Sequence, residues 1–341
     1  MHVFFDGTFV WVCFSVLYGE QKKILDKEPK IGNFTRINFG GILKVFQGDN
    51  HVILWDGENI YGLGSNWEGE LGSMHIELTY RDIIFPEKID IEPIKDVYCG
   101  PNYTVYLAHS GRLYFFGCNY NRINNSPTKL FNQLEINLPN DEEIDFVSCN
   151  DKYIIIKTLN DTFYRVILDR DNIKNNINKW KCIKPIIENI EYPKNVMSIN
   201  GELLLTDEEC LYEYDKNTKN WVMNEELPGI TKIGNYFNNN YLLDINHNVW
   251  RQCKYKKFEC ISNTNNKLSN ILDIYCTKST MYLKTIDNKI FAFGKNDNNQ
   301  INKEIFNQQY YTSREAVQIF KGHEDIWYIP PYFSKQKSAR K

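Results

Sequence analysis

An apolar residue followed directly by an aromatic residue recurs at regular intervals along the whole chain. The seven pairs are Val10-Trp11, Ile60-Tyr61, Leu113-Tyr114, Phe163-Tyr164, Leu211-Tyr212, Val249-Trp250 and Ile290-Phe291. Their first members are 50, 53, 50, 48, 38 and 41 residues apart, and each interval holds three or four short β-rich runs without the pattern of a long helix. Repeats of this length built from short strands are typical of β-propellers, in which four-stranded sheets stack radially. The sequence therefore predicts an all-β fold, a β-propeller with seven blades.

Turn-forming residues precede five of these pairs by two or three positions. They are Asp6-Gly7, Asp56-Gly57, Ser110-Gly111, Asn160-Asp161 and Asp287-Asn288, which tolerate the positive φ of a tight hairpin. After three pairs, a glycine stands four positions beyond the first apolar residue and an asparagine six positions beyond it: Gly64 and Asn66, Gly117 and Asn119, Gly294 and Asn296. Because a phosphate-binding loop would occur only once, this recurrence indicates structural positions and not cofactor ligands.

The two ends of the chain predict one shared, composite blade. Residues 317–329 read as the first two strands of a repeat that then stops, and residues 1–16 read as closing strands around Val10-Trp11. Joining them would remove the exposed sheet edges that invite aggregation. The expected repeats are residues 42–93, 94–143, 144–191, 192–229, 230–270, 271–315, and 316–333 completed by 1–41, within a single propeller over 1–333. Residues 334–341 are expected to form a basic flexible tail that carries Lys335, Lys337, Arg340 and Lys341.

Charge and composition exclude several classes of protein. The 43 acidic and 40 basic residues leave a net charge of −3, which excludes a globally basic nucleic-acid binder. The nine cysteines are spread over the chain and not packed as in a secreted disulfide scaffold, so the cytoplasm or nucleus is the expected location. Residues 3–17 are apolar, but no basic region precedes them and Asp6-Gly7 interrupts them, so we expect neither a signal peptide nor a membrane span.

Three repeats share a longer pattern. It consists of a β-rich run, Gly-x-x-His, a hairpin, the apolar-aromatic pair, and then x-x-Gly-x-Asn-x-x-Gly-x-Leu-Gly. Residues 48–51 and 64–72 carry it nearly in full, and residues 100–124 and 275–302 carry it in weaker form. This pattern resembles the regulator of chromosome condensation repeat, whose family forms seven-bladed propellers. In the fourth to sixth repeats only the hydrophobic pattern and the spacing match.

Two other propeller families match less of the chain. Residues 211–215 followed by Asn220-Trp221 look like a kelch blade, but Gly40-Gly41 is the only double glycine, and kelch needs one in most blades. Trp55-Asp56 spells the WD dipeptide, yet it lies in a predicted turn and does not recur.

Motifs for cofactor or metal binding are incomplete. Residues 62–67 begin like a dinucleotide-binding loop, but Trp67 replaces the third glycine and no helix follows. Cys253 and Cys260 are separated by more residues than the usual pair of zinc ligands. We therefore expect no cofactor, no metal and no enzymatic activity.

Two residue types at repeat positions are interpreted as structural. Cys99, Cys149 and Cys276 stand at equivalent positions of three repeats, which predicts small buried side chains on an inner strand. His51 occupies the histidine position of the repeat and is interpreted as an imidazole that bonds within or between blades.

The loops at the faces of a propeller carry its function. The longest predicted connections are residues 73–92, 125–142 and 166–190, and they contain arginine and aromatic side chains, the types enriched at interface hot spots. We interpret the following as partner-binding residues: Arg170, Trp180, Tyr80, Arg81 and Phe85. The expected function is a non-enzymatic protein-interaction scaffold that is monomeric and has neither a membrane partner nor sequence-specific nucleic acid binding.

The resemblance leaves two alternatives open. Some members of the family are guanine-nucleotide exchange factors for a Ran-type small GTPase and also dock on nucleosomes, but the face loops here show no motif match to their exchange residues. The other alternative is a chromatin-associated adaptor that partners a JmjC-type oxygenase, which this chain resembles in layout only. Release of labelled nucleotide from a panel of GTPases would separate the first alternative from a scaffold.

Overall fold

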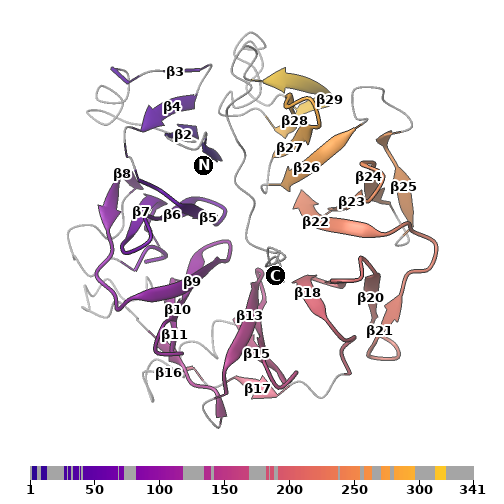
Figure 1. The fold of residues 1–341 in the computed structure, drawn as a ribbon, viewed down its shortest axis with the longest axis horizontal. Coiled ribbons are helices and arrows are strands. Elements are labelled where there is room, and N and C mark those ends of the chain that lie inside the picture. The colour runs from indigo at the N-terminus through magenta and orange to yellow at the C-terminus, as the bar shows by residue number, and fades with distance from the viewer. Residues whose placement is uncertain are drawn as a thin grey trace, which may run out of the picture. The chain divides into compact units, whose positions relative to one another are not determined.

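The computed structural model of the chain consists of seven small sheets, which we call blades (Figure 1). Among the described residues there is no α-helix, and the fold is an all-β, seven-bladed β-propeller. The chain divides into two compact units, residues 39–189 and residues 2–38 with 190–341. The structure describes residues 2–5, 9–13, 27–28, 30–31, 34–37, 39, 41–67, 69–72, 82–117, 134–139, 142–168, 182–183, 185–187, 191–236, 239–253, 257–262, 270–276, 280–295 and 312–319.

The unit of residues 39–189 contains three blades. The first comprises β5 (Lys44–Gln47), β6 (His51–Trp55), β7 (Ile60–Ser65) and β8 (Asp82–Lys88). The second comprises β9 (Ile94–Cys99), β10 (Tyr103–Ala108), β11 (Leu113–Gly117), β12 (Leu134–Ile136) and β16 (Cys182–Ile183). The third comprises β13 (Ile144–Cys149), β14 (Tyr153–Thr158), β15 (Phe163–Ile167) and β17 (Ile186–Ile187).

The other unit contains four blades. One is formed near the N-terminus by β1 (His2–Phe5), β2 (Val10–Cys13), β4 (Phe34–Ile37) and β3 (Lys30–Ile31), in that spatial order. The next comprises β18 (Val196–Asn200), β19 (Leu203–Thr206), β20 (Leu211–Asp215) and β21 (Asn220–Met223). It is followed by β22 (Ile230–Tyr236), β23 (Asn239–Asp244), β24 (Val249–Gln252) and β25 (Phe258–Cys260). The last comprises β26 (Ile271–Cys276), β27 (Thr280–Thr285), β28 (Ile290–Lys295) and β29 (Thr312–Ile319).

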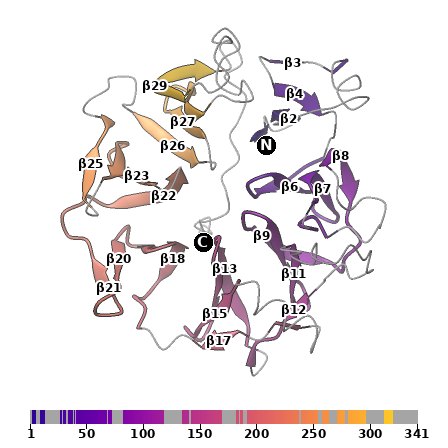
Figure 2. The ribbon, with the colours of Figure 1, turned by 180° about the vertical axis from the view of Figure 1, so that it is seen from behind.

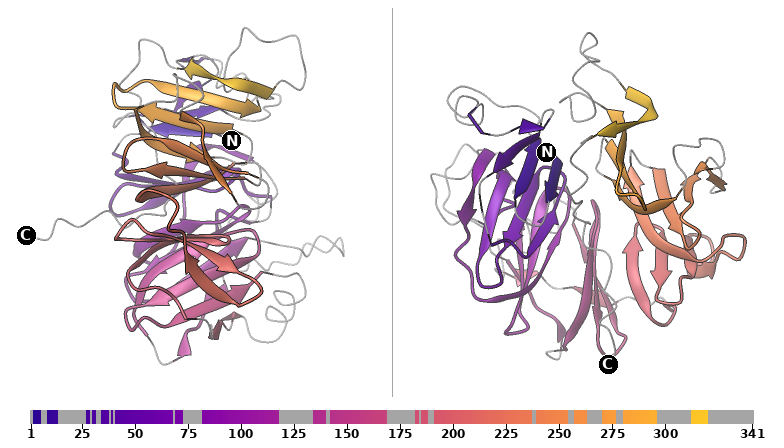
Figure 3. Two further views of the ribbon diagram at one scale, coloured as in Figure 1. Left: turned by 90° about the vertical axis from the view of Figure 1, so that its right-hand side faces the viewer. Right: turned by 45° about the horizontal axis from the view of Figure 1, so that its top comes forward.

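The middle strands of the blades are buried on both faces. All six side chains of β10 are buried, and those of β27 are buried in the same way. Successive side chains of a strand point to opposite faces, so a blade with such a strand must pack against neighbours on both sides. Within each unit the opening strands follow one another from blade to blade, as β18, β22 and β26 do (Figure 2). Neighbouring strands within the blades are antiparallel, apart from the parallel pair of β12 and β16; Figure 3 shows the sheets from two further sides.

The apolar-aromatic pairs lie where the repeat pattern places them. The first residues of six pairs begin the third strands of their blades, and Val10 begins β2. All seven first residues are buried: Val10, Ile60, Leu113, Phe163, Leu211, Val249 and Ile290. The turn residues Gly57, Gly111, Asp161 and Asn288 have positive φ, as predicted.

An aromatic cluster packs the N-terminal blade against the blade of β26–β29. The ring of Phe4 lies 4.9 Å from that of Tyr282 and 5.2 Å from that of Phe34, both edge to face. Tyr275 stacks on Tyr282 at 5.5 Å, and Trp11 completes the cluster. The two ends of the chain are therefore joined by buried aromatic rings within this unit.

One part of the composite-blade prediction is wrong. Val317–Ile319 do not open a new blade, because they form the end of β29, which pairs with β28 as the outer strand of the preceding blade. The sequence of residues 317–319 was interpreted wrongly because an outer strand and an opening strand of a blade show the same alternation of residues. Residues 320–341, including the predicted basic tail, lie outside the described residues.

The predicted long connections also contain strands. β8 lies within residues 73–92, β12 within 125–142, and β16 and β17 within 166–190. The segment 182–187 contributes to two blades in succession, because β16 runs parallel to β12 and β17 pairs with β15. β12, β16 and β17 are only two or three residues long, too short to show an alternation in the sequence, whereas β8 was overlooked although it carries the apolar run 83–85.

Replacing Phe4 by alanine tests the aromatic cluster. The side chain is fully buried, so its loss removes its transfer free energy and leaves a cavity, which together lower the free energy of unfolding by about 3–5 kcal/mol. Urea denaturation measures the change. Ile286→Ala, on a side chain 51% exposed in the same unit, is the matched control and should change stability by no more than about 0.5 kcal/mol. Equal effects of the two substitutions would contradict the packing role of Phe4.

Replacing Gly117 by alanine tests the repeat glycine. Gly117 has φ 112°, and an added Cβ would lie 2.5 Å from the carbonyl oxygen of Asn102. Both the strain and the contact with backbone are unfavourable, so Gly117→Ala should destabilise the chain by about 1–3 kcal/mol. Gly111 also has a positive φ, but no atom lies within 4 Å of an added Cβ. Gly111→Ala therefore introduces backbone strain without a steric contact, and the difference between the two substitutions measures the destabilisation due to the contact. An unchanged denaturation midpoint for Gly117→Ala would show that the backbone relaxes there.

Candidate interaction site

Five hairpins between the second and third strands of their blades share one backbone geometry. In each, the first residue donates a backbone hydrogen bond to the carbonyl of the fifth, and the fourth donates to the carbonyl of the first, with N···O distances of 2.9–3.1 Å. The fourth residue has positive φ in all five: Gly111, Asp161, Glu209, His247 and Asn288. The hairpins are residues 108–112, 158–162, 206–210, 244–248 and 285–289.

In the four hairpins that begin with Thr or Asp, the side chain of the first residue also forms a hydrogen bond within the hairpin. The hydroxyl of Thr285 accepts a hydrogen bond from the backbone N–H of Lys289 at 3.0 Å. Asp244 plays the same part with Oδ1, which accepts from the backbone N–H groups of Asn246 and Asn248, both at 2.8 Å. Its Oδ2 accepts from the indole N–H of Trp250 at 2.8 Å. The tips are therefore rigid platforms for their exposed side chains.

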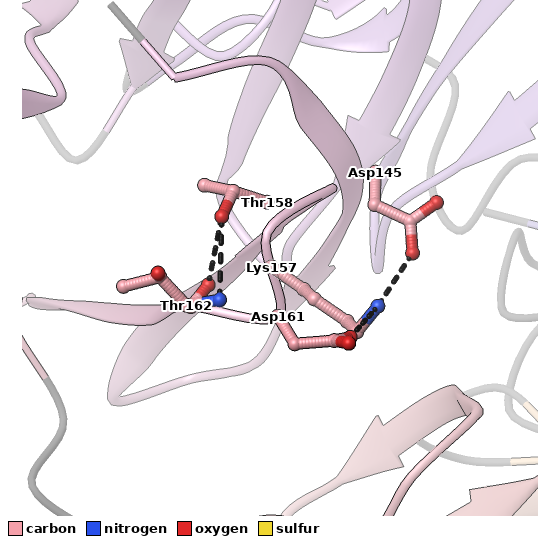
Figure 4. A network of polar contacts seen from close by, with 5 residues as sticks. All are labelled: Asp145, Lys157, Thr158, Asp161 and Thr162. Carbon is pink, nitrogen blue, oxygen red and sulfur yellow. Dashed lines mark hydrogen bonds and ion pairs between the residues drawn. The ribbon is translucent and has the colours of Figure 1, made fainter. Parts of the chain in front are cut away.

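The hairpin of residues 158–162 is further fixed by a buried lysine (Figure 4). The ammonium group of Lys157 lies 2.8 Å from Oδ2 of Asp145 on β13 and 2.7 Å from Oδ1 of Asp161 at the tip. Burial lowers the pKa of Lys157, but the hydrogen bonds and charges of the two carboxylates outweigh burial, so the pKa is raised overall. The two ion pairs of Lys157 therefore connect the tip of this hairpin to strand β13.

Lys284 occupies the equivalent position of β27 but has a different electrostatic environment. It stands opposite Asp273 in the strand register, and that carboxylate already accepts a hydrogen bond from Lys232 of the neighbouring blade at 2.5 Å. Burial lowers the pKa of Lys284, and the charge of Asp273 opposes this only in part. The same repeat position thus carries a lysine with a raised pKa in one unit and a lowered pKa in the other.

The second residue of each hairpin is exposed. Three of the five are large aliphatic side chains: Leu159, Ile245 and Ile286 are 56%, 47% and 51% exposed. The other two are His109 and Asp207. The hairpin geometry is the same with all five side chains, so the fold does not require an aliphatic residue here. Exposed aliphatic side chains on rigid supports are typical of protein-binding surfaces.

A groove of about 470 Å³ opens beside the hairpin of residues 108–112. Its lining carries both signs of charge, from Lys95, His109, Arg112, Glu135, Glu142 and Glu143. Oε1 of Glu142 accepts a hydrogen bond from the hydroxyl of Tyr164 at 2.8 Å, and burial followed by this bond raises the pKa of Tyr164 to about 12. The mixed charge favours polar contacts with a protein surface over capture of one small ion.

The predicted partner-binding residues are not brought together by the described structure. Tyr80, Arg81, Arg170 and Trp180, together with Phe131, lie outside the described residues. Phe85 lies in strand β8 and not in a loop, so its assignment to a loop is corrected. The exposed hairpin residues were missed by the sequence interpretation. A large aliphatic residue directly after the Thr or Asp that ends a strand, and before Asn or Asp, is the signal that could have found them.

His51 links two blades, as expected of a structural imidazole. Its Nε2 lies 2.9 Å from the hydroxyl oxygen of Thr104, which itself donates to the carbonyl of Glu70 at 2.7 Å. Since that hydroxyl proton is used, Nε2 of His51 carries the proton and donates to Thr104. Burial lowers the pKa of His51 to about 3, so the ring is neutral.

The other repeat positions also have structural contacts where they are described. Asn66 is fully buried, and its Oδ1 accepts a hydrogen bond from the backbone N–H of Leu71 at 3.0 Å. Gly64, Gly117 and Gly294 all have positive φ. Asn119 and Asn296 lie outside the described residues.

The cysteines at equivalent repeat positions lie on opening strands and are free thiols. Cys149 is buried, whereas Cys99 and Cys276 are partly exposed, so the prediction of burial is correct for one of the three. Burial raises the pKa of the Cys149 thiol to about 12. Within the described ranges, no group of three or more His, Cys, Asp or Glu side chains could hold a metal ion. The same part of the chain contains no helix with the length and hydropathy needed to cross a membrane.

Comparisons of sequence find one limited relationship. No protein-family model matches this chain. A segment of 105 residues is 30% identical to the serine/threonine-protein kinase Nek9 of Xenopus laevis, and the match covers 30% of this chain and 11% of the kinase.

Comparisons of structure extend over nearly the whole chain. Human WBSCR16 matches with a TM-score of 0.64 and 14% identity, over 94% of each chain. Prp20p of Saccharomyces cerevisiae, described with its binding to Gsp1p and histones, matches with a TM-score of 0.55 and 12% identity over 82% of this chain and 76% of its own. A second structure, yeast RCC1 (Prp20) bound by Kap60, has a TM-score of 0.56 and 12% identity, over 82% of this chain and 74% of that one. The chain thus has the propeller fold of the regulator of chromosome condensation type.

The neutral buried His51 predicts a pH dependence of stability. The folded-state pKa is lowered to about 3, whereas the unfolded chain binds the proton near pH 6.5. The unfolded state therefore binds more protons below that pH, and between pH 6.5 and 5 this residue should lower the free energy of unfolding by about 2 kcal/mol. His51→Gln removes the titration. Urea denaturation at both pH values should show a smaller pH effect in the variant, and an equal pH effect in both proteins would exclude His51 as its source.

Proposed function

We propose that this propeller is a non-enzymatic protein-interaction scaffold that binds partners through the end of the blades where the hairpins lie. The observation that carries the proposal is the repeated exposure of Leu159, Ile245 and Ile286 on hairpins whose geometry does not depend on them. Aliphatic side chains held on rigid supports lose little entropy when a partner covers them. The cytoplasm and the nucleus both suit this function, and the chain acts as a monomer.

The loop residues named from the sequence form a second candidate surface within the same proposal. Tyr80, Arg81, Arg170 and Trp180, with Phe85 of β8, have the side-chain types that anchor interfaces. In the sequence, Tyr80 and Arg81 follow β7, and Arg170 and Trp180 follow β15; these third strands end on the opposite side of their blades from the hairpins. The two candidate surfaces can therefore be tested separately.

Paired sets of substitutions separate the two surfaces. The hairpin set is Leu159→Ala, Ile245→Ala and Ile286→Ala, and the loop set is Arg81→Ala, Arg170→Ala and Trp180→Ala. A single anchor contributes about 2 kcal/mol, so loss of one anchor should weaken the affinity for a captured partner by roughly 30-fold. Affinity capture with the tagged full chain, followed by titration of each captured protein, measures the effect.

The outcome of this comparison decides between the surfaces. Loss of affinity in the hairpin set alone supports the hairpin end, and loss in the loop set alone moves the interface to the opposite end. Full affinity in both sets, with unchanged stability, would exclude both surfaces.

The alternative function is nucleotide exchange on a small GTPase, or an adaptor role on chromatin. The likeness in fold to Prp20p, which is described with its binding to Gsp1p and histones, is the observation that favours it. Release of labelled GDP from a panel of small GTPases tests exchange. If the purified chain accelerates the release of GDP, exchange activity becomes the proposed function in place of the scaffold.

A further inference from the structure

One region of the unit of residues 2–38 and 190–341 combines exposed carboxylates with exposed aliphatic side chains. It lies at the hairpin end of the three blades β18–β21, β22–β25 and β26–β29. We define this acidic-aliphatic surface by the exposed residues Asp207, Glu208, Glu225, Glu226, Ile245, Leu272 and Ile286, together with the half-buried Glu209. The carboxylates come from the first blade and its connection to the second, and the aliphatic side chains come from the second and third blades.

Backbone hydrogen bonds fix these elements to one another. The N–H of Ile230, at the start of β22, donates to the carbonyl of Glu209 at 2.7 Å. The N–H of Ile245 donates to Gly229 at 2.9 Å, and the N–H of Ile271, at the start of β26, donates to His247 at 3.0 Å. The hairpins of three consecutive blades are thereby connected through the opening strands between them.

The carboxylates of this surface lack neutralising partners. None of the five forms an ion pair with any residue that the structure describes. The exposed Lys194 precedes Asn195, whose carbonyl accepts a backbone hydrogen bond from Asp207 at 3.0 Å, so this part of the surface also carries a cation. On the third hairpin, Lys289 and Asp287 pair with each other at 2.6 Å. Among the described residues that define or adjoin this surface, five carboxylates without an ion pair stand against the one lysine Lys194, which favours a negative potential.

The carboxylate of Glu209 and the aliphatic side chain of Ile245 both lie next to Gly229. A Cβ added there would lie 3.2 Å from Oε2 of Glu209 and 3.2 Å from Cγ2 of Ile245. The carboxylate of Glu209 and the side chain of Ile245 therefore both pack closely on this glycine. A partner that covers this part of the surface would contact a negative charge and an aliphatic group side by side.

We propose that the acidic-aliphatic surface docks a basic protein segment that also carries aliphatic side chains. This inference rests on the proposed scaffold function and names the chemistry of its partner. The unpaired carboxylates would repel nucleic acid phosphates and anionic membranes, whereas lysine or arginine would neutralise them. The exposed Ile245, Leu272 and Ile286, which are 47%, 41% and 51% exposed, would be covered by the aliphatic residues of the segment.

A synthetic peptide tests the proposal on the full chain. The probe is a short fluorescein-labelled peptide in which lysine, leucine and serine alternate, and binding is read by fluorescence anisotropy. We expect saturable binding that weakens from roughly 50 mM to roughly 300 mM salt, because the carboxylates are exposed. Replacing every lysine of the peptide by glutamate, or every leucine by serine, should weaken binding at least about tenfold.

Variants of the chain locate the binding. Glu208→Lys combined with Glu226→Lys, and Ile245→Ala combined with Ile286→Ala, should each weaken peptide binding at least about tenfold. Glu58→Lys combined with Asp151→Lys changes the net charge equally on exposed residues of the other unit and should leave affinity within about twofold. Equal losses in both charge variants would show a net-charge effect and overturn the proposal.

Two further results would also overturn it. Binding of the serine-substituted peptide as tightly as the parent would remove the aliphatic part of the proposal. Absence of peptide binding, while the hairpin variants still lose their captured partners, would refute the basic segment but leave the scaffold function standing.

Discussion

Burial of both faces of the middle strands is the constraint on which the rest of this structure depends. β10 and β27 bury every side chain, so neither blade can be stable beside water on one face. Each blade must therefore have a neighbour on both sides, and the chain must repeat. The aromatic cluster around Phe4 meets this requirement where the first and last blades of the chain pack together. Only at the blade ends are side chains free of the need to pack against a neighbouring sheet, which is why the proposed interaction surfaces lie there.

The repeat also explains why the same hairpin occurs five times with different side chains. Its geometry comes from backbone hydrogen bonds and from a residue with positive φ, which is glycine, aspartate, glutamate, histidine or asparagine. Because neither the backbone hydrogen bonds nor the residue with positive φ involves the second residue of the hairpin, the side chain of that second residue can vary. Lys157 and Lys284 show that electrostatics can differ at equivalent positions in the same way. The fold thus holds the tips in place and leaves their chemistry to the individual blade.

Much of the fold could be predicted from the sequence, because the features that specify it recur. The apolar-aromatic pairs predicted the blade number, and the Asp, Asn and Gly turns predicted the hairpins. The outer strands β12, β16 and β17 could not be predicted, since two or three residues are too few to show an alternation. The shared alternation of outer and opening strands placed Val317 in an opening strand when it belongs to β29. The candidate site was missed because the sequence interpretation looked for partner-binding residues in the longest connections, whereas Ile245 and Ile286 lie at the tips of short hairpins.

The exposed aliphatic side chains differ from ordinary surface residues in one respect. A single exposed isoleucine needs no explanation, since folded proteins expose much apolar surface. Here Leu159, Ile245 and Ile286 occupy the same position of a repeated element, where His109 and Asp207 show that polar side chains are equally compatible with the fold. Packing within the blades therefore does not account for aliphatic residues at this position, and this is the argument on which the proposed contact with a partner rests.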